Sequence, residues 1–212
     1  MLVGERAITI NRQEKVIHSS AGRTVFYDKL IMATGSYPWI PPIKGAETQD
    51  CFVYRTIEDL NAIESCARRS KRGAVVGGGL LGLEAAGALK TSAETHVIEF
   101  APMLMAEQLD QMGGEQLRRK IESMGVKVTP AKHQRDCSAG HRGAQTMHFA
   151  DGSELQVDFI VFSTGIRRAS HPVRAGGRGG IMVTIAARPP IRIYAIGNAP
   201  AGTTASTVWS PP

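Results

Sequence analysis

Short apolar runs alternate with helix-forming stretches through the middle of the chain. Ala74–Val76 and His96–Ile98 are apolar runs that suit buried parallel strands. Between them, Leu83–Lys90 is rich in Ala, Leu and Glu, which are good helix formers. Leu30–Ala33 and Phe159–Phe162 are further buried runs. This strand–helix–strand order predicts an α/β fold with a Rossmann-like βαβ domain built on a parallel sheet.

Alternating apolar and polar residues predict antiparallel strands in two other places. Near the start of the chain the alternation covers Ala7–Ile10, Lys15–His18 and Thr24–Phe26. Later, Met147–Phe149 and Glu154–Val157 flank an Asp-Gly dipeptide, which is a strong hairpin signal. We therefore expect a small antiparallel hairpin beside the parallel sheet.

Two more helices are indicated by their start and stop signals. Thr56 supplies an N-cap hydroxyl, and Glu58 and Asp59 place acids in the first turn. Gln108–Met124 has helical periodicity and is closed by Gly125. Its expected core positions are Leu109, Met112, Leu117, Ile121 and Met124.

Composition and charge exclude several classes of protein. The 212 residues are 42% hydrophobic, which supports a globular core, and no run of 18 apolar residues predicts a membrane span. The net charge of +6 arises in residues 159–212, which carry six arginines and no acid. These arginines lie among Gly, Pro and Ala without interleaved aromatics, so we do not expect a nucleic-acid surface.

The cysteines and the amino terminus indicate a cytoplasmic protein. Cys51, Cys66 and Cys137 are scattered and form no C-x-x-C pair, so neither a zinc site nor a redox dithiol is predicted. The start of the chain lacks a basic region followed by an apolar stretch, so no secretory signal is expected. Three free thiols fit a reducing compartment.

A glycine-rich turn carries the clearest candidate chemistry. Residues 77–82 read GGGLLG, which satisfies G-x-G-x-x-G directly after an apolar strand and before a helix. Gly77 permits the tight turn, Gly79 lets a pyrophosphate approach the backbone, and Gly82 allows close helix–strand packing. The free N–H groups at the helix start favour phosphates.

An acid at the end of the next strand completes this pattern. Glu99 lies 17 residues after Gly82 and can accept hydrogen bonds from the adenosine ribose hydroxyls. Its charge would repel a 2′-phosphate, so the sequence predicts NADH rather than NADPH. The alternative is a glycine-rich turn without a ligand, but such a turn would not need a carboxylate at residue 99.

Four motifs in order resemble one enzyme family. A-T-G at 33–35, G-G-G-L-L-G-L-E at 77–84, S-T-G at 163–165 and Y-A-I-G at 194–197 occur as in the FAD- and NAD-dependent pyridine nucleotide–disulphide oxidoreductases. Within that family, the segments YDKLIMATGSYPWIPPIKG and VIEFAPMLMAEQLDQMGG look like the large subunits of bacterial NADH-dependent nitrite reductases. The resemblance is close over about residues 1–128 and 146–167.

The resemblance implies roles for particular residues. The flavin-side contacts would be made by Thr34, Gly35, Thr164, Gly165 and Gly197. Asn198 stands where the family has an acid, and it can hydrogen-bond but lacks the charge. Glu84 matches the acid near the nicotinamide in related reductases, and the alternative is an ordinary carboxylate in the first turn of the helix. No residue is predicted to be a catalytic acid, base or nucleophile, because the cofactors carry the chemistry.

The resemblance also implies domains, cofactors and partners. Residues 1–50 would be part of a FAD-binding domain, 51–165 the NAD-binding domain, and 166–212 a degenerate return to the FAD domain. The implied function is electron transfer from NADH through FAD toward nitrite. Siroheme and an iron–sulfur cluster are expected only elsewhere in a full-length relative. A small subunit and a second copy of the chain are the implied protein partners.

Departures from the family leave three further hypotheses open. No second G-x-G-x-x-G for the ADP part of FAD occurs in the 212 residues, so the chain is alternatively a non-catalytic NAD-binding fragment. A further alternative is that the chain is a ferredoxin- or rubredoxin-reductase-like flavoprotein. Residues 129–145, 168–192 and 199–212 lose the apolar periodicity, and we hypothesise that they are read in a shifted frame. The alternative for these windows is divergence in loops.

Overall fold

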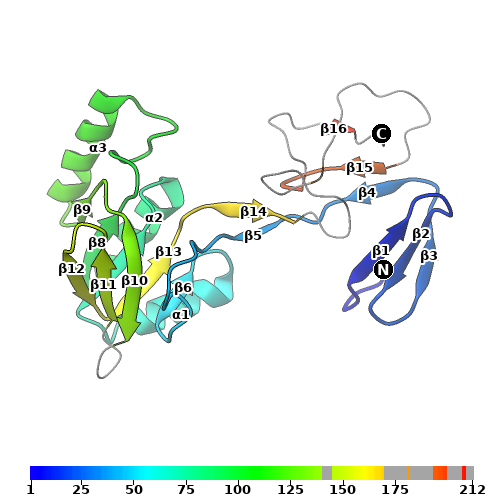
Figure 1. The fold of residues 1–212 in the computed structure, drawn as a ribbon, viewed down its shortest axis with the longest axis horizontal. Helices are drawn as coiled ribbons and strands as arrows, with labels where there is room; N and C mark the ends of the chain where they lie inside the picture. Colours follow the sequence, from blue (N-terminus) through cyan, green and yellow to red (C-terminus); the bar gives the residue numbers. More distant parts are fainter. Residues whose placement is uncertain (140–144, 170–180, 182–192, 200–206, 209–212) are drawn as a thin grey trace. The chain divides into compact units, whose positions relative to one another are not determined.

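The computed structural model describes residues 1–139, 145–169, 181, 193–199 and 207–208 (Figure 1). The chain divides into two compact units. The first joins Met1–Tyr37 to Ile166–Pro212, and the second is Pro38–Gly165. Each unit is described by itself below.

A five-stranded parallel sheet forms the centre of the second unit. Its strand order is β6-β13-β7-β8-β9, and every neighbouring pair is parallel. Both faces of the central strands are covered, which explains why these strands are continuous apolar runs. The predicted α/β fold with a parallel sheet is confirmed. The strands are β6 (Cys51–Val53), β7 (Arg72–Val76), β8 (Glu94–Ile98), β9 (Lys127–Thr129) and β13 (Phe159–Phe162).

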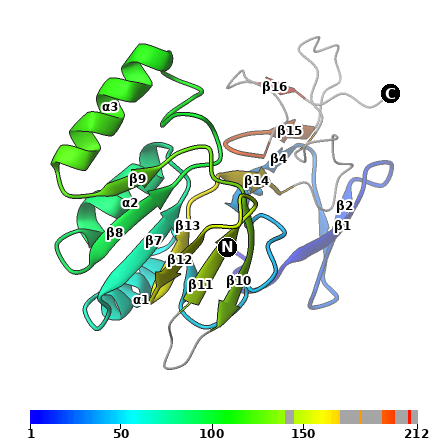
Figure 2. The same cartoon turned by 60° about the vertical axis from the view of Figure 1, so that its left-hand side comes forward.

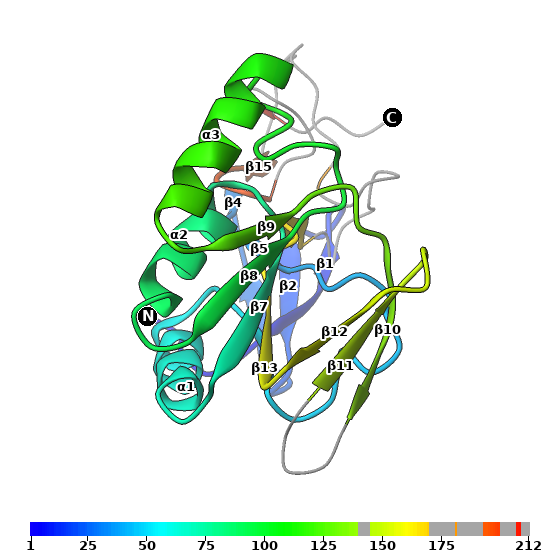
Figure 3. The ribbon, with the colours of Figure 1, turned by 90° about the vertical axis from the view of Figure 1, so that its left-hand side faces the viewer.

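Three helices cover one face of this sheet (Figure 3). Val75, Val97 and Val161 point from the sheet into a core shared with residues from all three helices. The first helix starts as predicted, because the Thr56 hydroxyl accepts from Asp59 N and the Asp59 carboxylate accepts from Thr56 N. The helices are α1 (Ile57–Ala67), α2 (Leu80–Leu89) and α3 (Gln111–Ser123).

An antiparallel sheet covers the other face (Figures 2 and 3). It contains β10 (Gln134–Ala139), β11 (Gln145–Phe149) and β12 (Glu154–Val157) in that order. The predicted hairpin is confirmed as β11 and β12. The strand β10 was not predicted, because its sequence QRDCSA lacks apolar alternation. Backbone pairing with β11 and a hydrogen bond from Cys137 N to Lys44 O form it instead.

The third helix differs from the sequence prediction at its start and on its apolar face. It begins at Gln111 rather than Gln108, because the Asp110 side chain accepts from Gly113 N as an N-cap. Met112 and Met124 were expected in the core but are 76% and 42% exposed. The contact with the sheet is made by Leu117 and Ile121, which pack against the helix-side core.

The described residues of the first unit form three small sheets. A meander of β1 (Ala7–Asn11), β2 (Val16–Ser19) and β3 (Thr24–Phe26) confirms the predicted antiparallel strands. The strand β4 (Leu30–Met32) pairs in parallel with β15 (Ile193–Ala195), which pairs antiparallel with β16 (Thr207–Val208). The strands β5 (Ser36–Pro38) and β14 (Ile166–Arg168) form the third sheet.

Much of the sequence assigned to a shifted frame lies outside the described residues. This applies to 140–144, 170–180, 182–192, 200–206 and 209–212. The frame hypothesis therefore stays a prediction. Among the described residues, no helix is long and apolar enough to cross a membrane.

Candidate dinucleotide site

The glycine-rich turn lies at the carboxyl edge of the parallel sheet. It links the end of β7 to the start of α2, and β7 stands between β8 and β13. From β7 the chain continues to β8 and β9 on one side, and it later forms β13 on the other side of β7. The order of the strands therefore switches direction between β7 and β13. In open α/β sheets, ligands bind at such a switch point outside the carboxyl ends of the strands.

The three motif glycines are required for three different reasons. Gly77 has a φ of +117°, which favours glycine, and an added Cβ would strike the Ser163 carbonyl. At Gly82 an added Cβ would collide with the Gly77 carbonyl oxygen, so this glycine permits the close contact between turn and helix. Gly79 has an ordinary extended backbone, and nothing lies within 4 Å of its added Cβ.

The open space at Gly79 fits a pyrophosphate. Gly79 is the N-cap residue of α2 and has no side chain that could cap the helix. The first N–H groups of α2 are therefore available to an anion, and the helix dipole favours negative charge there. The glycine at this position leaves room for a ligand and is not required by the backbone dihedrals.

Glu99 is bound to the glycine turn itself. Its Oε2 accepts from Gly78 N at 2.5 Å, and its Oε1 accepts from Ala101 N at 2.7 Å. A carboxylate has about four lone-pair sites, so two backbone bonds leave capacity for ribose hydroxyls. The half-buried carboxylate thus lies next to the turn, as the sequence predicts for a ribose-binding acid.

The second Thr-Gly turn lies beside the glycine turn. An added Cβ on Gly77 would come within 3.4 Å of Thr164 N, so the end of β13 lies against the start of the motif. The Thr164 hydroxyl donates to Trp39 O at 2.5 Å, and Trp39 N donates to Gly165 O at 3.0 Å. Gly165 has a φ of +99°. These bonds fix the two segments where the chain enters and leaves the second unit.

Glu84 lies in the second turn of α2 and is exposed. The alternative role of a first-turn carboxylate is wrong, because α2 begins at Leu80 and has no acid in its first turn. Leu80 and Leu81, which precede it, are 61% and 53% exposed at the helix start. The start of α2 therefore carries two exposed apolar side chains, and an exposed acid follows one turn later.

In the first unit, the other predicted flavin-side residues meet at one sheet edge. Thr34 and Gly35 follow β4, and Gly197 and Asn198 follow its parallel neighbour β15. Gly35 and Gly197 both have a φ of +67°, with nothing within 4 Å of an added Cβ. The Asn198 amide donates to Ser36 Oγ at 3.5 Å. The Thr34 hydroxyl donates to Ala169 O at 2.9 Å.

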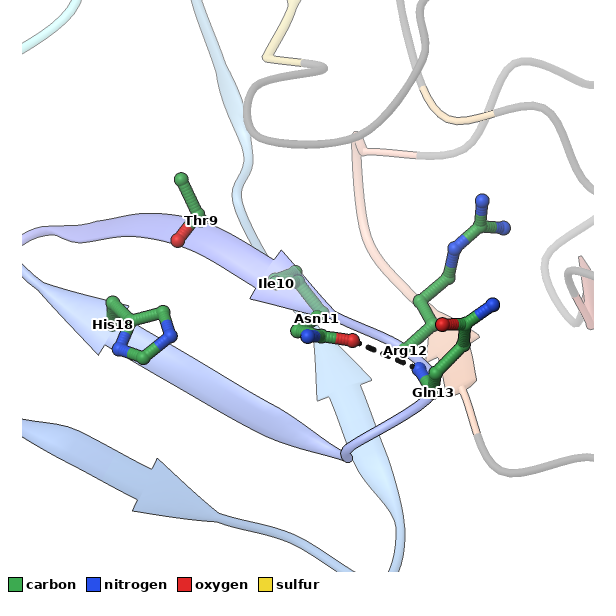
Figure 4. Close-up of a pocket in the computed structure, with 6 residues that line it drawn as sticks. All are labelled: Thr9, Ile10, Asn11, Arg12, Gln13 and His18. Carbon is green, nitrogen blue, oxygen red and sulfur yellow. Dashed lines mark hydrogen bonds between the residues drawn. The ribbon is translucent and has the colours of Figure 1, made fainter.

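An open pocket in the first unit lies over the β1–β2 turn (Figure 4). The Asn11 side chain accepts from Gln13 N at 3.1 Å and stabilises the turn. None of the predicted site residues lines this pocket, so it has no part in the dinucleotide site. Its lining residues are Thr9, Ile10, Asn11, Arg12, Gln13 and His18.

A charged cluster lies at the opposite edge of the parallel sheet. Glu94 accepts from Lys127 Nζ at 2.9 Å, from His96 Nε2 at 2.9 Å and from Arg72 Nε at 3.0 Å. These donors, led by Lys127 and then His96, lower the pKa of Glu94 to about 2. Burial lowers the pKa of His96, so at neutral pH the ring is uncharged and donates a neutral hydrogen bond. The cluster is structural, because it lies away from the carboxyl ends of the strands.

The cysteines are poor nucleophiles at neutral pH. Burial raises the pKa of Cys137 to about 12, and burial also raises the pKa of Cys51 and of Cys66. All three are free thiols. In the described part of the chain, no group of three or more His, Cys, Asp or Glu side chains is arranged to hold a metal ion.

Comparison with known proteins decides the family. The family model for pyridine nucleotide-disulphide oxidoreductases matches residues 1–207. The chain belongs to this family. This is the family that the sequence resemblance implied.

Curated members of the family narrow the relationship. The chain is 75% identical over 206 residues to the nitrite reductase (NADH) large subunit of Escherichia coli K12. The aligned region covers 93% of this chain and 24% of that protein. It is 46% identical over 187 residues to the nitrite reductase [NAD(P)H] large subunit of Klebsiella oxytoca, covering 85% of this chain and 19% of the relative. The chain thus spans about a quarter or less of the length of these relatives.

Solved structures of other family members share the fold. A NAD-dependent persulfide reductase from A. fulgidus has a TM-score of 0.86 at 26% identity, covering 99% of this chain and 41% of that chain. A ferredoxin reductase from Rhodopseudomonas palustris has a TM-score of 0.85 at 20% identity, covering 99% and 54%. The second likeness shows the fold alone.

Proposed function

We propose that this chain is the NADH-binding and flavin-side portion of a nitrite reductase (NADH) large subunit. The observation that carries the proposal is the 75% identity to such a subunit, together with a glycine turn bonded to Glu99. The proposed reaction passes electrons from NADH through FAD toward nitrite. When bound, NADH would supply a hydride and FAD would accept it.

The residues of the second unit have distinct proposed roles on the NADH side. The N–H groups at the start of α2 hold the pyrophosphate across the space left by Gly79. Glu99 orients the adenosine ribose and repels a 2′-phosphate. Glu84 orients the nicotinamide carboxamide, while Leu80 and Leu81 exclude water from the ring. None of these side chains has to move a proton.

Most of the proposed flavin-side residues belong to the first unit. Thr34, Gly35, Gly197 and Asn198 follow two neighbouring parallel strands, and the carboxyl edge of parallel strands is where cofactors bind. The two positive-φ glycines leave space for the ribityl chain and phosphate. Thr164 and Gly165, at the end of the second unit, are the remaining flavin contacts that the family resemblance implies. On this assignment residues 1–50 and 166–212 are parts of a FAD-binding domain, and 51–165 is the NAD-binding domain.

Onward electron transfer requires further groups and partners. Siroheme and an iron–sulfur cluster are assigned to other parts of a full-length protein, as is contact with a small subunit. A relative from Bacillus subtilis is named an assimilatory nitrate reductase electron transfer subunit, which supports a partner that accepts electrons. A second copy of the chain is a further proposed partner. Three free thiols support a cytoplasmic location.

A chimera tests this proposal. Residues 38–165 would replace the matching segment of the Escherichia coli nitrite reductase (NADH) large subunit, since this unit contains the whole proposed NADH site. We expect NADH-dependent nitrite reduction to be retained. A folded, flavin-containing chimera that no longer oxidises NADH would contradict the proposal, with the unmodified relative as the control.

A further inference from the structure

An exposed aromatic pair lies directly beside Glu99. Phe100 follows the acid in sequence and is 69% exposed. Its ring centroid lies 4.1 Å from that of His133, and the two planes are tilted by 30°. A large aromatic ring that is stacked on one side and open on the other presents a flat apolar surface to a ligand.

Backbone hydrogen bonds hold the two rings together. Glu99 N donates to Thr129 O at 3.0 Å, Lys132 N donates to Glu99 O at 2.9 Å, and Ala131 N donates to Ala101 O at 2.9 Å. The segment after β9 therefore runs beside the segment after β8 and carries His133 to Phe100. Ala131 has a φ of +55°, a costly conformation for a residue with a side chain. Such strain persists where surrounding contacts fix the backbone, as they do here.

The side chain of Lys132 anchors this loop. Its ammonium group pairs with the Asp151 carboxylate and donates to Ser153 Oγ at 2.8 Å. It also lies 5.3 Å from the centre of the Phe149 ring. The ammonium is thus engaged by the β11–β12 hairpin, and its contribution to the site is to hold His133 in position.

We propose that the Phe100–His133 pair is a stacking platform for the adenine ring of the dinucleotide. This inference rests on the proposed NADH site. Glu99 would accept hydrogen bonds from the hydroxyls of the adenosine ribose, and the adenine is attached to the same ribose. The base therefore lies one sugar ring away from that carboxylate. Phe100 follows Glu99 in sequence, so its exposed ring belongs to the same edge of the sheet as that carboxylate. The platform contributes affinity for adenine and not for the nicotinamide half.

Truncation of the platform tests this role. Base–aromatic stacking accounts for about a tenfold or greater change in affinity when the aromatic side chain is removed. We expect Phe100→Ala to weaken NADH and ADP-ribose binding by about tenfold, and His133→Ala to weaken both by a smaller factor. Reduced nicotinamide mononucleotide, which lacks adenine, should bind the variants and the unmodified chain equally. Affinities are measured by calorimetry, with circular dichroism to verify folding.

A matched variant controls for the loss of an exposed aromatic side chain. Phe26→Ala removes a 77% exposed phenylalanine from β3, in the other unit, and should leave all three affinities unchanged. Phe100→Tyr keeps a stacking ring and should retain NADH affinity. Equal NADH affinity of folded Phe100→Ala and the unmodified chain would overturn the platform.

The outcomes separate this inference from the proposed function. If the unmodified chain binds neither NADH nor ADP-ribose, the NADH site itself fails, and the platform fails with it. If the unmodified chain binds both ligands and Phe100→Ala binds them equally well, only the platform fails. Phe100 would then be free to serve as a docking residue for a protein partner.

Discussion

A single carboxylate is hydrogen-bonded to the glycine-rich turn. Glu99 accepts backbone hydrogen bonds from Gly78 and Ala101, so it fixes the turn, and on the proposed assignment it also binds the adenosine ribose. The sequence predicted the acid from its spacing to the motif. It did not predict these backbone bonds, because they depend on the path of the chain after β8, which has no periodic signal.

Glu99→Gln should narrow the preference between NADH and NADPH. The amide keeps the size of the side chain and one acceptor oxygen, but it removes the charge that repels a 2′-phosphate. A hydrogen bond to a charged group contributes about 1.5–3 kcal/mol, so NADH should bind about tenfold or more weakly. NADPH should bind more tightly than it does to the unmodified chain. Fluorescence titration with both nucleotides measures the change; an unaltered ratio of affinities would contradict the assigned role.

At the scale of elements, α2 combines packing with ligand access. Gly82 faces the Gly77 carbonyl, whereas Gly87 on the same helix has nothing within 4 Å of an added Cβ. The G-x-G-x-x-G motif predicted close packing at Gly82 but gave no information on Gly87, which lies outside it. The structure shows that Gly87 is not required by any close contact.

These two glycines give a matched pair of variants. Gly82→Ala should lower the free energy of unfolding by about 1–3 kcal/mol, because the methyl group has to displace backbone. Gly87→Ala should raise it by about 0.5–1 kcal/mol, since alanine has the higher helix propensity. Urea unfolding measures both changes. Similar effects of the two substitutions would refute the close contact at Gly82.

Elements with local signals could be predicted from the sequence, and elements formed by tertiary pairing could not. The N-cap at Thr56, the Asp-Gly hairpin and the buried strands of the parallel sheet all have local patterns, and these are confirmed. The predicted burial of Leu30–Ala33 is wrong, because Ile31 in β4 is 62% exposed. The polar strand β10 has none, because pairing with β11 forms it. Likewise, Met112 matched the helical period of α3 yet is exposed, since only part of the predicted stripe reaches the sheet.

At the scale of the whole molecule, the Glu94 cluster couples stability to pH. The pKa of Glu94 is lowered in the folded state, so its contribution is complete above the unfolded value of about 4.3. It is lost as the pH falls toward the folded value of about 2. The lowered pKa of His96 also makes the protein less stable at acid pH. This loss of stability begins as the pH falls below the unfolded pKa of about 6.5.

Glu94→Gln should therefore make the free energy of unfolding depend less on pH in the acid range. The variant should be less stable than the unmodified chain at pH 7, and the difference should shrink as the pH falls from 5 to 3. Urea unfolding at several pH values measures this. Lys29→Gln, a substitution on a residue in the other unit, provides a charge-change control. Parallel profiles for Glu94→Gln and the unmodified chain would rule out the cluster as a source of acid sensitivity.

The two units differ in how completely they provide a cofactor site. The second contains the glycine turn, the acid and the helix start, whereas the first contributes Thr-Gly and Gly-Asn segments without a second G-x-G-x-x-G in the 212 residues. We expect a polypeptide of these 212 residues to purify without bound flavin and to show no NADH-dependent dye reduction. Visible absorption before and after adding FAD measures this, and a stoichiometric flavin spectrum would contradict it.

The most direct test of the NADH site is a calorimetric titration of NADH into the unmodified chain and into Gly79→Val. Gly79 has an extended backbone and open space around it, so the valine should leave the fold intact and fill the place of the pyrophosphate. The account predicts one NADH bound per unmodified chain and no binding to the folded variant. A folded unmodified chain that binds no NADH, or a variant with unchanged affinity, would contradict it.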